Sequence, residues 1–142
     1  MKKFSITLVI FGLFFTQLTY AGDHQTGQQL YKANCASCHG TTGGMNMSKR
    51  KAPPIIGVRM HYIGTYSDKD SFVMAIADWV ENRNVDTSMM RGAIRRFGVM
   101  PAVKVSREQS EKIAAYIYEG DLEKPKGFQQ HYEERHGKKK HH

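Results

Sequence analysis

The segment Cys-Ala-Ser-Cys-His at residues 35–39 constrains this chain more than any other feature, because it contains both of its cysteines. Two cysteines at this spacing are typical of a redox dithiol, of half a zinc site, or of a covalent attachment point for haem. A zinc site needs four ligands, and the chain has no second pair of cysteines. A thioredoxin-like dithiol belongs to a strand–helix unit, whereas the residues that flank Cys35 favour helix.

Covalent haem attachment is the interpretation that uses all three of these side chains. Cys35 and Cys38 can add to the two vinyl groups of haem, and His39 is then placed beneath the iron as an axial ligand. An ordinary disulfide between the two cysteines would close a very small, strained loop and add little stability. Haem attachment is therefore favoured, and a redox dithiol remains the alternative.

The first 21 residues have the pattern of a secretory signal peptide. Lys2 and Lys3 precede an apolar run over residues 4–15, and the small residue Ala21 lies at the expected cleavage site. The apolar run is shorter than the ~20 residues that span a bilayer. We expect cleavage after Ala21, export to a periplasmic compartment and no stable membrane insertion afterwards, with an uncleaved anchor as the alternative.

Residues 22–120 have the length of one small domain. The whole chain has 21 Lys+Arg and 13 Asp+Glu residues. Because the first 21 residues contain two of the lysines and no acid, the remainder has 19 basic residues against 13 acidic ones, a balance of about +6. Such a domain favours acidic protein partners or anionic surfaces, and no basic-aromatic motif indicates nucleic-acid binding.

The segment CASCHG (residues 35–40), followed far downstream by FGVMPA (residues 97–102), resembles small class I c-type cytochromes. The resemblance extends over approximately residues 23–120. It implies an all-α fold of three to five helices wrapped around one covalently bound haem c. It also implies one-electron transfer to redox partner proteins, with a histidine and a methionine on the iron and no enzymatic activity of its own.

Helical patterning predicts helices at both ends of this domain. The first is expected over residues 23–33, with Asp23 as its N-cap, and the resemblance implies that Gly27 and Tyr31 meet the terminal helix near Tyr116. The terminal helix is expected over residues 106–120. Its start has the capping-box pattern Ser106-x-x-Gln109, and Gly120 is its stop signal.

Two further helices are expected between these ends. Residues 67–83 are amphipathic, with Ser67 as the expected cap and Trp79 in the core or in the wall of a haem cavity. Residues 88–96 form a second helical segment that ends at Gly98. It has a basic face, Arg91, Arg95 and Arg96, which is either a solvated surface or a rim that attracts an acidic redox partner.

Met100 is the expected second axial ligand. Gly98 frees the backbone before it, Pro101 stiffens the backbone after it, and the resemblance places the ligand shortly before the terminal helix. Three reserve ligands remain: Met89, Met90 and His61. A thioether on the iron stabilises its reduced state.

Two neighbouring prolines could orient the imidazole of His39. In the family that the chain resembles, a proline carbonyl accepts the second ring N–H of the ligating histidine, which fixes its tautomer. Pro53 and Pro54 are both candidates, and Pro54 is favoured. Ile55 and Ile56 are expected to pack on the haem edge, whereas residues 57–84 exceed a minimal family pattern and have no assigned purpose.

Residues 121–142 lose the helical periodicity and are expected to form a mobile polar tail. Four histidines lie in it: His131, His136, His141 and His142. A histidine-rich segment can bind copper or zinc. Two other functions therefore stay open, a haem enzyme or sensor with an open sixth iron position and a metal carrier that uses the tail, and the chain could also be a subunit of a larger redox enzyme.

Overall fold

The computed structural model describes residues 26–40 and 50–120, together with positions 122, 127, 130, 133 and 134. Six helices have described bounds: α1 (Gly27–Asn34), α2 (Ala36–His39), α3 (Ile55–Ile63), α4 (Lys69–Asn82), α5 (Arg91–Phe97) and α6 (Arg107–Glu119). This confirms the all-α fold, and two of these helices, α2 and α3, are additional to the four whose positions the sequence patterns predicted. The expected signal peptide and most of the expected tail lie outside the described residues. Among the helices described, none has the length and hydrophobicity needed to span a membrane.

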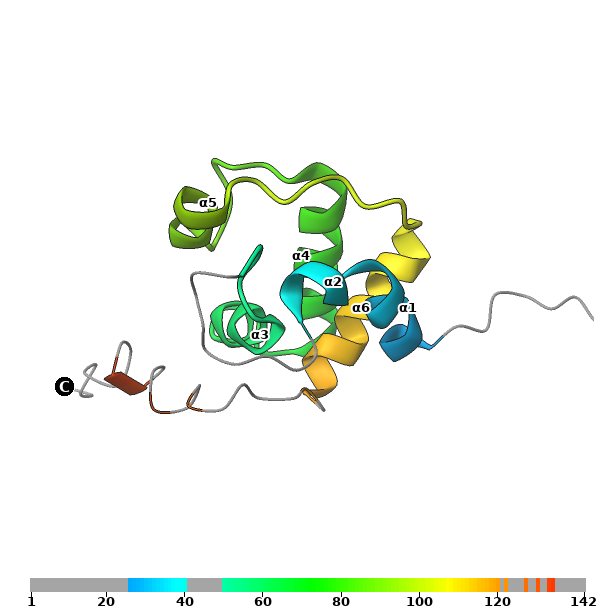
Figure 1. The fold of residues 1–142 in the computed structure, drawn as a ribbon. Helices are drawn as coiled ribbons and strands as arrows, with labels where there is room; N and C mark the ends of the chain where they lie inside the picture. Colours follow the sequence, from blue (N-terminus) through cyan, green and yellow to red (C-terminus); the bar gives the residue numbers. More distant parts are fainter. Residues whose placement is uncertain are drawn as a thin grey trace, which may run out of the picture.

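Helix α6 packs against both α1 and α4, whereas α5 lies apart from these three helices (Figure 1). The α1–α6 crossing is close at Gly27. A Cβ atom at this position would lie 2.1 Å from the carbonyl oxygen of Lys112 and 2.9 Å from the Cβ of Tyr116. The rings of Tyr31 and Tyr116 are 5.7 Å apart. The expected meeting of Gly27 and Tyr31 with the terminal helix is confirmed.

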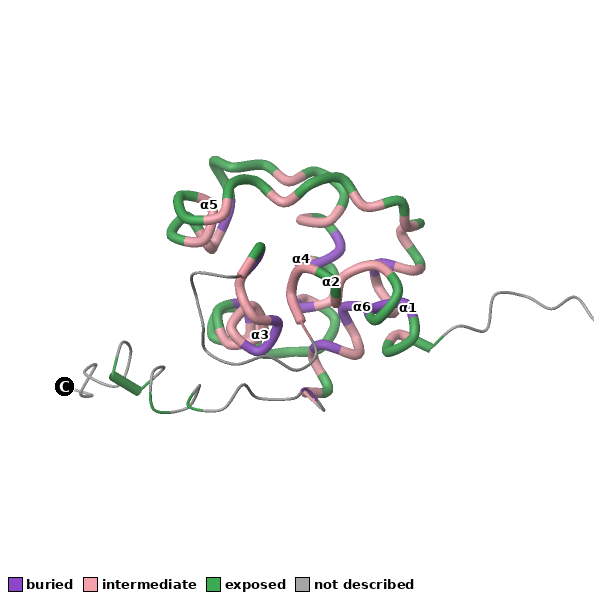
Figure 2. Tube along the Cα trace, viewed as in Figure 1, coloured by how far each residue is buried: buried purple, intermediate pink, exposed green. Residues whose placement is uncertain are grey.

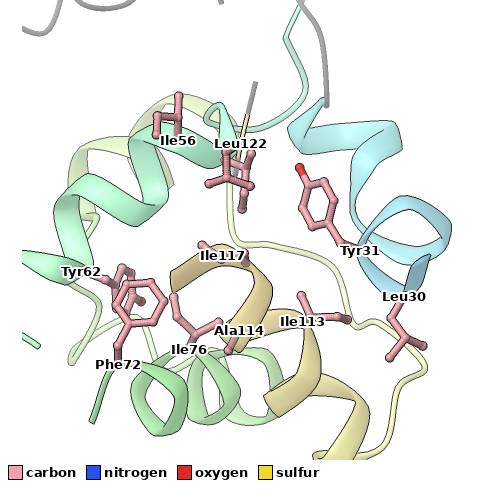
Figure 3. Packing of buried hydrophobic residues seen from close by; sticks show 11 residues of the cluster. Leu30, Tyr31, Ile56, Tyr62, Phe72, Ile76, Ile113, Ala114, Ile117 and Leu122 are labelled. Atoms are coloured by element: carbon pink, nitrogen blue, oxygen red, sulfur yellow. The ribbon is translucent and has the colours of Figure 1, made fainter. Parts of the chain in front are cut away.

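The hydrophobic core lies between α1, α3, α4 and α6 (Figure 3). Tyr31 and Phe72 are completely buried, and Ile113 and Ile117 fill the face of α6 that is directed toward them. Leu122 is also buried and belongs to the same cluster. The packed part of the chain therefore extends past Gly120, where the domain was expected to end.

Capping boxes form the starts of two helices, and the sequence pattern predicted one of them. The capping box at the start of α6 is confirmed: the Ser106 hydroxyl accepts from the Gln109 N–H, and the Gln109 side chain accepts from the Ser106 N–H. Gly120 ends this helix with φ of 78°, in the left-handed region that glycine adopts without cost. The same type of box starts α1, but it is made by Thr26 with Gln29.

Two expected N-caps are wrong. Helix α1 starts at Gly27 after the Thr26 cap, so Asp23, which lies outside the described residues, is not its N-cap. Helix α4 is capped by Asp68, whose carboxylate accepts a 2.9 Å hydrogen bond from the Ser71 N–H, and not by Ser67. Serine and aspartate are equally good caps, so the backbone path into the helix decides between adjacent positions.

Helix α5 begins at Arg91, three residues later than expected. Ser88 lies in the preceding turn, where its hydroxyl accepts a 3.2 Å hydrogen bond from the Met90 N–H. Gly98 ends α5 as expected, with φ of 81° and ψ of 179°, a conformation that is essentially limited to glycine. Exposed residues dominate α5 and the segment that leads from it to α6 (Figure 2).

Candidate haem site

The two cysteines and His39 project from one tight turn. Cys35 ends α1 and begins α2, and its carbonyl oxygen accepts from the backbone N–H of Cys38 at 3.2 Å and of His39 at 3.0 Å. This folding follows from the helical character of the flanking residues and brings both thiols and the imidazole to the end of α1. The turn stops at Gly40, which has φ of 73° and ψ of 154°.

The imidazole of His39 is oriented by Pro53, so the expected role of Pro54 is wrong. The Nδ1–H of His39 donates to the Pro53 carbonyl oxygen at 2.8 Å. The Pro54 carbonyl has another task, because Pro54 is the N-cap of α3 and its oxygen accepts from the N–H groups of Gly57 at 2.9 Å and Val58 at 3.1 Å. With Nδ1 protonated, Nε2 keeps the lone pair that binds a metal. Burial lowers the pKa of His39 and thereby favours the neutral ring, and the hydrogen bond to Pro53 opposes this shift.

A hydrophobic cavity lies beside this turn. Its walls come from α2, α3, α4 and α5 and from the segments 51–53 and 98–105. The apolar side chains that line it include Val58, Trp79, Ile94 and Phe97, and Cys35, Cys38 and His39 line it as well. Trp79 is thus a cavity-wall residue. Ile55 and Ile56 do not line the cavity, contrary to expectation; both are buried in the hydrophobic core instead.

The Cys35 thiol does not have the lowered pKa that is typical of the attacking cysteine in a redox dithiol. Both cysteines are free, and burial, reinforced by the nearby Cys38, raises the pKa of Cys35 to about 11. The attacking cysteine of a redox dithiol has a lowered pKa because the thiolate is the nucleophile. Among the described residues no group of three or more His, Cys, Asp or Glu side chains is placed to hold a metal ion. Two thiols and an imidazole at the edge of an apolar cavity match the requirements of a flat, apolar haem that is bound through its vinyl groups.

Of the four candidates for the second iron ligand, two line the cavity that contains His39 and two do not. Met100 and Met90 both line the cavity that contains His39. Met89 instead lines a separate groove next to Tyr66. His61 is exposed on α3 and does not line the cavity.

The family model for cytochrome c matches residues 24–120. The chain belongs to the cytochrome c family. A cytochrome c domain binds its haem covalently, so haem c is the cofactor of this cytochrome. Cytochrome c6 of Pyropia yezoensis is 40% identical to it over 48 residues, which correspond to 32% of this cytochrome and 42% of the cytochrome c6. The match therefore spans less than half of that relative's length, and no solved structure gives a significant match.

The sequence of this cytochrome contains a signal that favours Pro53 over Pro54 as the hydrogen-bond acceptor for His39. Helix α3 begins directly after Pro54, and an N-cap residue uses its carbonyl for the first hydrogen bond of the helix. Placing the helix start at Ile55 would have excluded the Pro54 carbonyl and left that of Pro53. No local signal indicated Val103 and Val105, which line the cavity from the segment before α6, because their placement depends on the path of that segment across the molecule.

Proposed function

We propose that this cytochrome carries single electrons between redox proteins in the compartment to which it is exported, with His39 and Met100 as the axial ligands of its haem. Haem supplies an Fe(III)/Fe(II) couple. The observation that supports the proposal best is that His39 and Met100 line one apolar cavity, together with the two attachment cysteines.

The protein's own residues have three tasks in this function. Cys35 and Cys38 hold the cofactor, and the hydrogen bond from His39 to Pro53 keeps the imidazole in one tautomer and orientation. The apolar cavity walls exclude water and lower the local polarity. A neutral thioether ligand and an apolar environment both favour the reduced iron, so we expect a comparatively high reduction potential.

Met100 is preferred to Met90 because of the segment on which it lies. The segment runs between two defined ends, Gly98 at the end of α5 and Ser106 at the start of α6, and it contains no helix. Arg107, the first residue of α6, forms ion pairs with Asp78 and Glu81 of α4. Met90 is instead the N-cap of α5, with its N–H bonded to Ser88, which restricts how its side chain can be directed.

Matched substitutions test the ligand. Met100→Ala and Met90→Ala remove the same side chain from two positions on one cavity. We expect Met100→Ala to abolish the weak near-infrared sulfur-to-iron absorption of the oxidised protein and to lower its potential, whereas Met90→Ala retains the band. Loss of the band in Met90→Ala alone would make Met90 the ligand. A low-spin spectrum that is unchanged in both variants would refute methionine ligation from either position.

An open sixth position, as in a haem enzyme or sensor, has less support. The candidate acid-base residue for such a site was His61, which is exposed and does not line the cavity. We therefore retain electron transfer as the function.

The partner is proposed to be a protein with an acidic surface. Helix α5 has two faces: Ala93, Ile94 and Phe97 line the cavity, whereas the three arginines on the other face, Arg91, Arg95 and Arg96, are exposed. Val99 is 47% exposed and also lines the cavity. Exposed apolar surface bordered by positive charge is suited to a transient complex with an acidic protein, because charge accelerates encounter and a small apolar contact limits residence.

Charge reversal tests this surface. We expect Arg95→Glu to lower the second-order rate constant of electron transfer with an acidic redox protein by about tenfold at low salt and to weaken its dependence on ionic strength. Lys32→Glu is the control, because it makes the same change of charge on an exposed residue of α1 that does not line the cavity. Equal effects of both substitutions would show that only net charge matters and would exclude α5 as the docking surface.

Export and the tail require separate measurements. The intact mass of the protein from cells that mature c-type cytochromes should correspond to residues 22–142 plus one haem. A mass that retains the first 21 residues would refute cleavage after Ala21. Titration of copper into chains with and without the residues after Gly120 tests whether the histidines of the tail bind metal.

A further inference from the structure

Tyr31 makes a contact whose effect reaches the haem-binding turn. Its side chain is completely buried on α1, and its hydroxyl donates a 2.6 Å hydrogen bond to the carbonyl oxygen of Gly40. Gly40 directly follows His39. A buried hydroxyl without a hydrogen-bond partner destabilises the folded state, so the Tyr31 hydroxyl favours conformations that keep the Gly40 carbonyl in place.

Gly40 is a position where the backbone needs an external restraint. Its φ of 73° and ψ of 154° lie in a region that is essentially limited to glycine, and glycine has more conformational freedom than any other residue. The Gly40 N–H is bonded to the Ala36 carbonyl oxygen at 2.8 Å within the turn. The Gly40 carbonyl is held from outside the turn, by Tyr31.

Tyr31 is itself held firmly by the α1–α6 crossing. Its ring packs against Tyr116 with the centroids 5.7 Å apart, and one turn earlier Gly27 allows the backbone of α1 to approach that of α6. Figure 3 shows the ring projecting from α1 with its oxygen directed away from Ile113. Burial raises the pKa of Tyr31 well above its usual range, which favours the protonated hydroxyl that donates to Gly40.

We propose that Tyr31 is a positioning residue for the haem ligand His39. It holds the Gly40 carbonyl and thereby the backbone from which the imidazole projects, while Pro53 holds the ring itself at Nδ1. The α1–α6 crossing is in this way coupled to the orientation of the iron ligand. The inference rests on the proposed ligation of the iron by His39.

The test compares two tyrosine-to-phenylalanine substitutions in the holoprotein. Tyr31→Phe removes the hydroxyl and retains the ring that packs on Tyr116. Tyr118→Phe is the matched control, because the Tyr118 hydroxyl also donates to a backbone carbonyl, that of Ser67, at 2.9 Å. The readouts are the exchange rate of the His39 Nδ1 proton and the chemical shifts of the His39 ring in the reduced protein, together with the reduction potential.

We expect Tyr31→Phe to accelerate exchange of the His39 Nδ1 proton by about tenfold, the factor that corresponds to the loss of one hydrogen bond, and to shift the ring resonances and the potential. Tyr118→Phe should leave all three unchanged. Identical behaviour of the two variants overturns the proposal. The parent protein separates this failure from that of the proposed function: if its His39 signals lack the large ring-current shifts of an iron ligand, ligation by His39 is wrong, and the positioning role is wrong with it.

Discussion

Replacing Gly27 with alanine should destabilise this cytochrome, although the same change at an exposed helical position should not. The added Cβ would lie 2.1 Å from the Lys112 carbonyl oxygen and would need about 0.9 Å more to reach even a tight contact of 3.0 Å. The obstacle is the backbone carbonyl of Lys112 in α6, which cannot rotate away as a flexible side chain could. The added Cβ can therefore be accommodated only if α1 and α6 move apart. Leu30 and Tyr31, both buried on α1, would then lose packing.

The expected magnitude follows from these contacts. Burial of two large side chains contributes on the order of 5 kcal/mol, and a gap of 0.5–1 Å removes roughly a quarter to a half of such contact energy. The residual overlap adds about 1–3 kcal/mol, and removal of a helical glycine returns about 1 kcal/mol. The net loss of unfolding free energy is about 3 kcal/mol, which lowers the melting temperature of a domain of this size by about 10–20 °C.

Guanidinium unfolding of the holoprotein, followed by far-ultraviolet circular dichroism, measures this loss. Gly92→Ala is the control, since a Cβ at this exposed position on α5 would meet only the Arg95 guanidinium at 3.8 Å. The control should be neutral or stabilise the protein by up to about 1 kcal/mol. If Gly27→Ala is as stable as Gly92→Ala, the close crossing of α1 and α6 is wrong.

Three further predictions concern Gly98, Ser106 and Asp68. A Cβ at Gly98 meets no atom within 4 Å, so Gly98→Ala should cost about 1–3 kcal/mol through backbone strain alone, and calorimetry of this variant with an unchanged stability would contradict the strained turn. Ser106→Ala removes the capping box of α6 and should lower the unfolding free energy by about 1 kcal/mol, with Ser37→Ala, an exposed serine that is not the N-cap of its helix, as the control. Hydrogen bonds from Ser71 lower the pKa of Asp68; its stabilising effect is therefore fully present above the ordinary aspartate pKa of ~4 and is lost as pH falls through the lowered value. Melting temperatures between pH 2 and 5 should fall less steeply for Asp68→Asn, which keeps a capping side chain that does not titrate, and parallel curves would refute this role of Asp68.

Local patterns predicted much of the fold because they act over three or four residues. The Ser106–Gln109 box and the Gly120 stop give the bounds of α6 correctly. The same rules placed the N-caps of α1 and α4 too early, at Asp23 and Ser67, because several suitable cap residues lie close together there and only the approach of the chain to the helix selects one.

The candidate haem site also has one part that a local pattern predicted and another part that depended on the tertiary structure. The Cys-x-x-Cys-His spacing is met within one turn of helix, so the class of cofactor was evident from the sequence by itself. Cys35 and Cys38 remain the predicted attachment residues, and His39 remains a predicted iron ligand. The acceptor for His39 lies 14 positions away in the chain. Its choice depended on α3 using the Pro54 carbonyl for its own first turn.

What the tertiary structure alone decided is which distant groups share one environment. It placed Met90 and Met100 on the cavity of His39, directed Met89 and His61 elsewhere, and brought the Tyr31 hydroxyl to Gly40. Spacing and capping rules contain no information about such contacts, because these depend on how whole helices pack and on which polar groups that packing leaves to be satisfied.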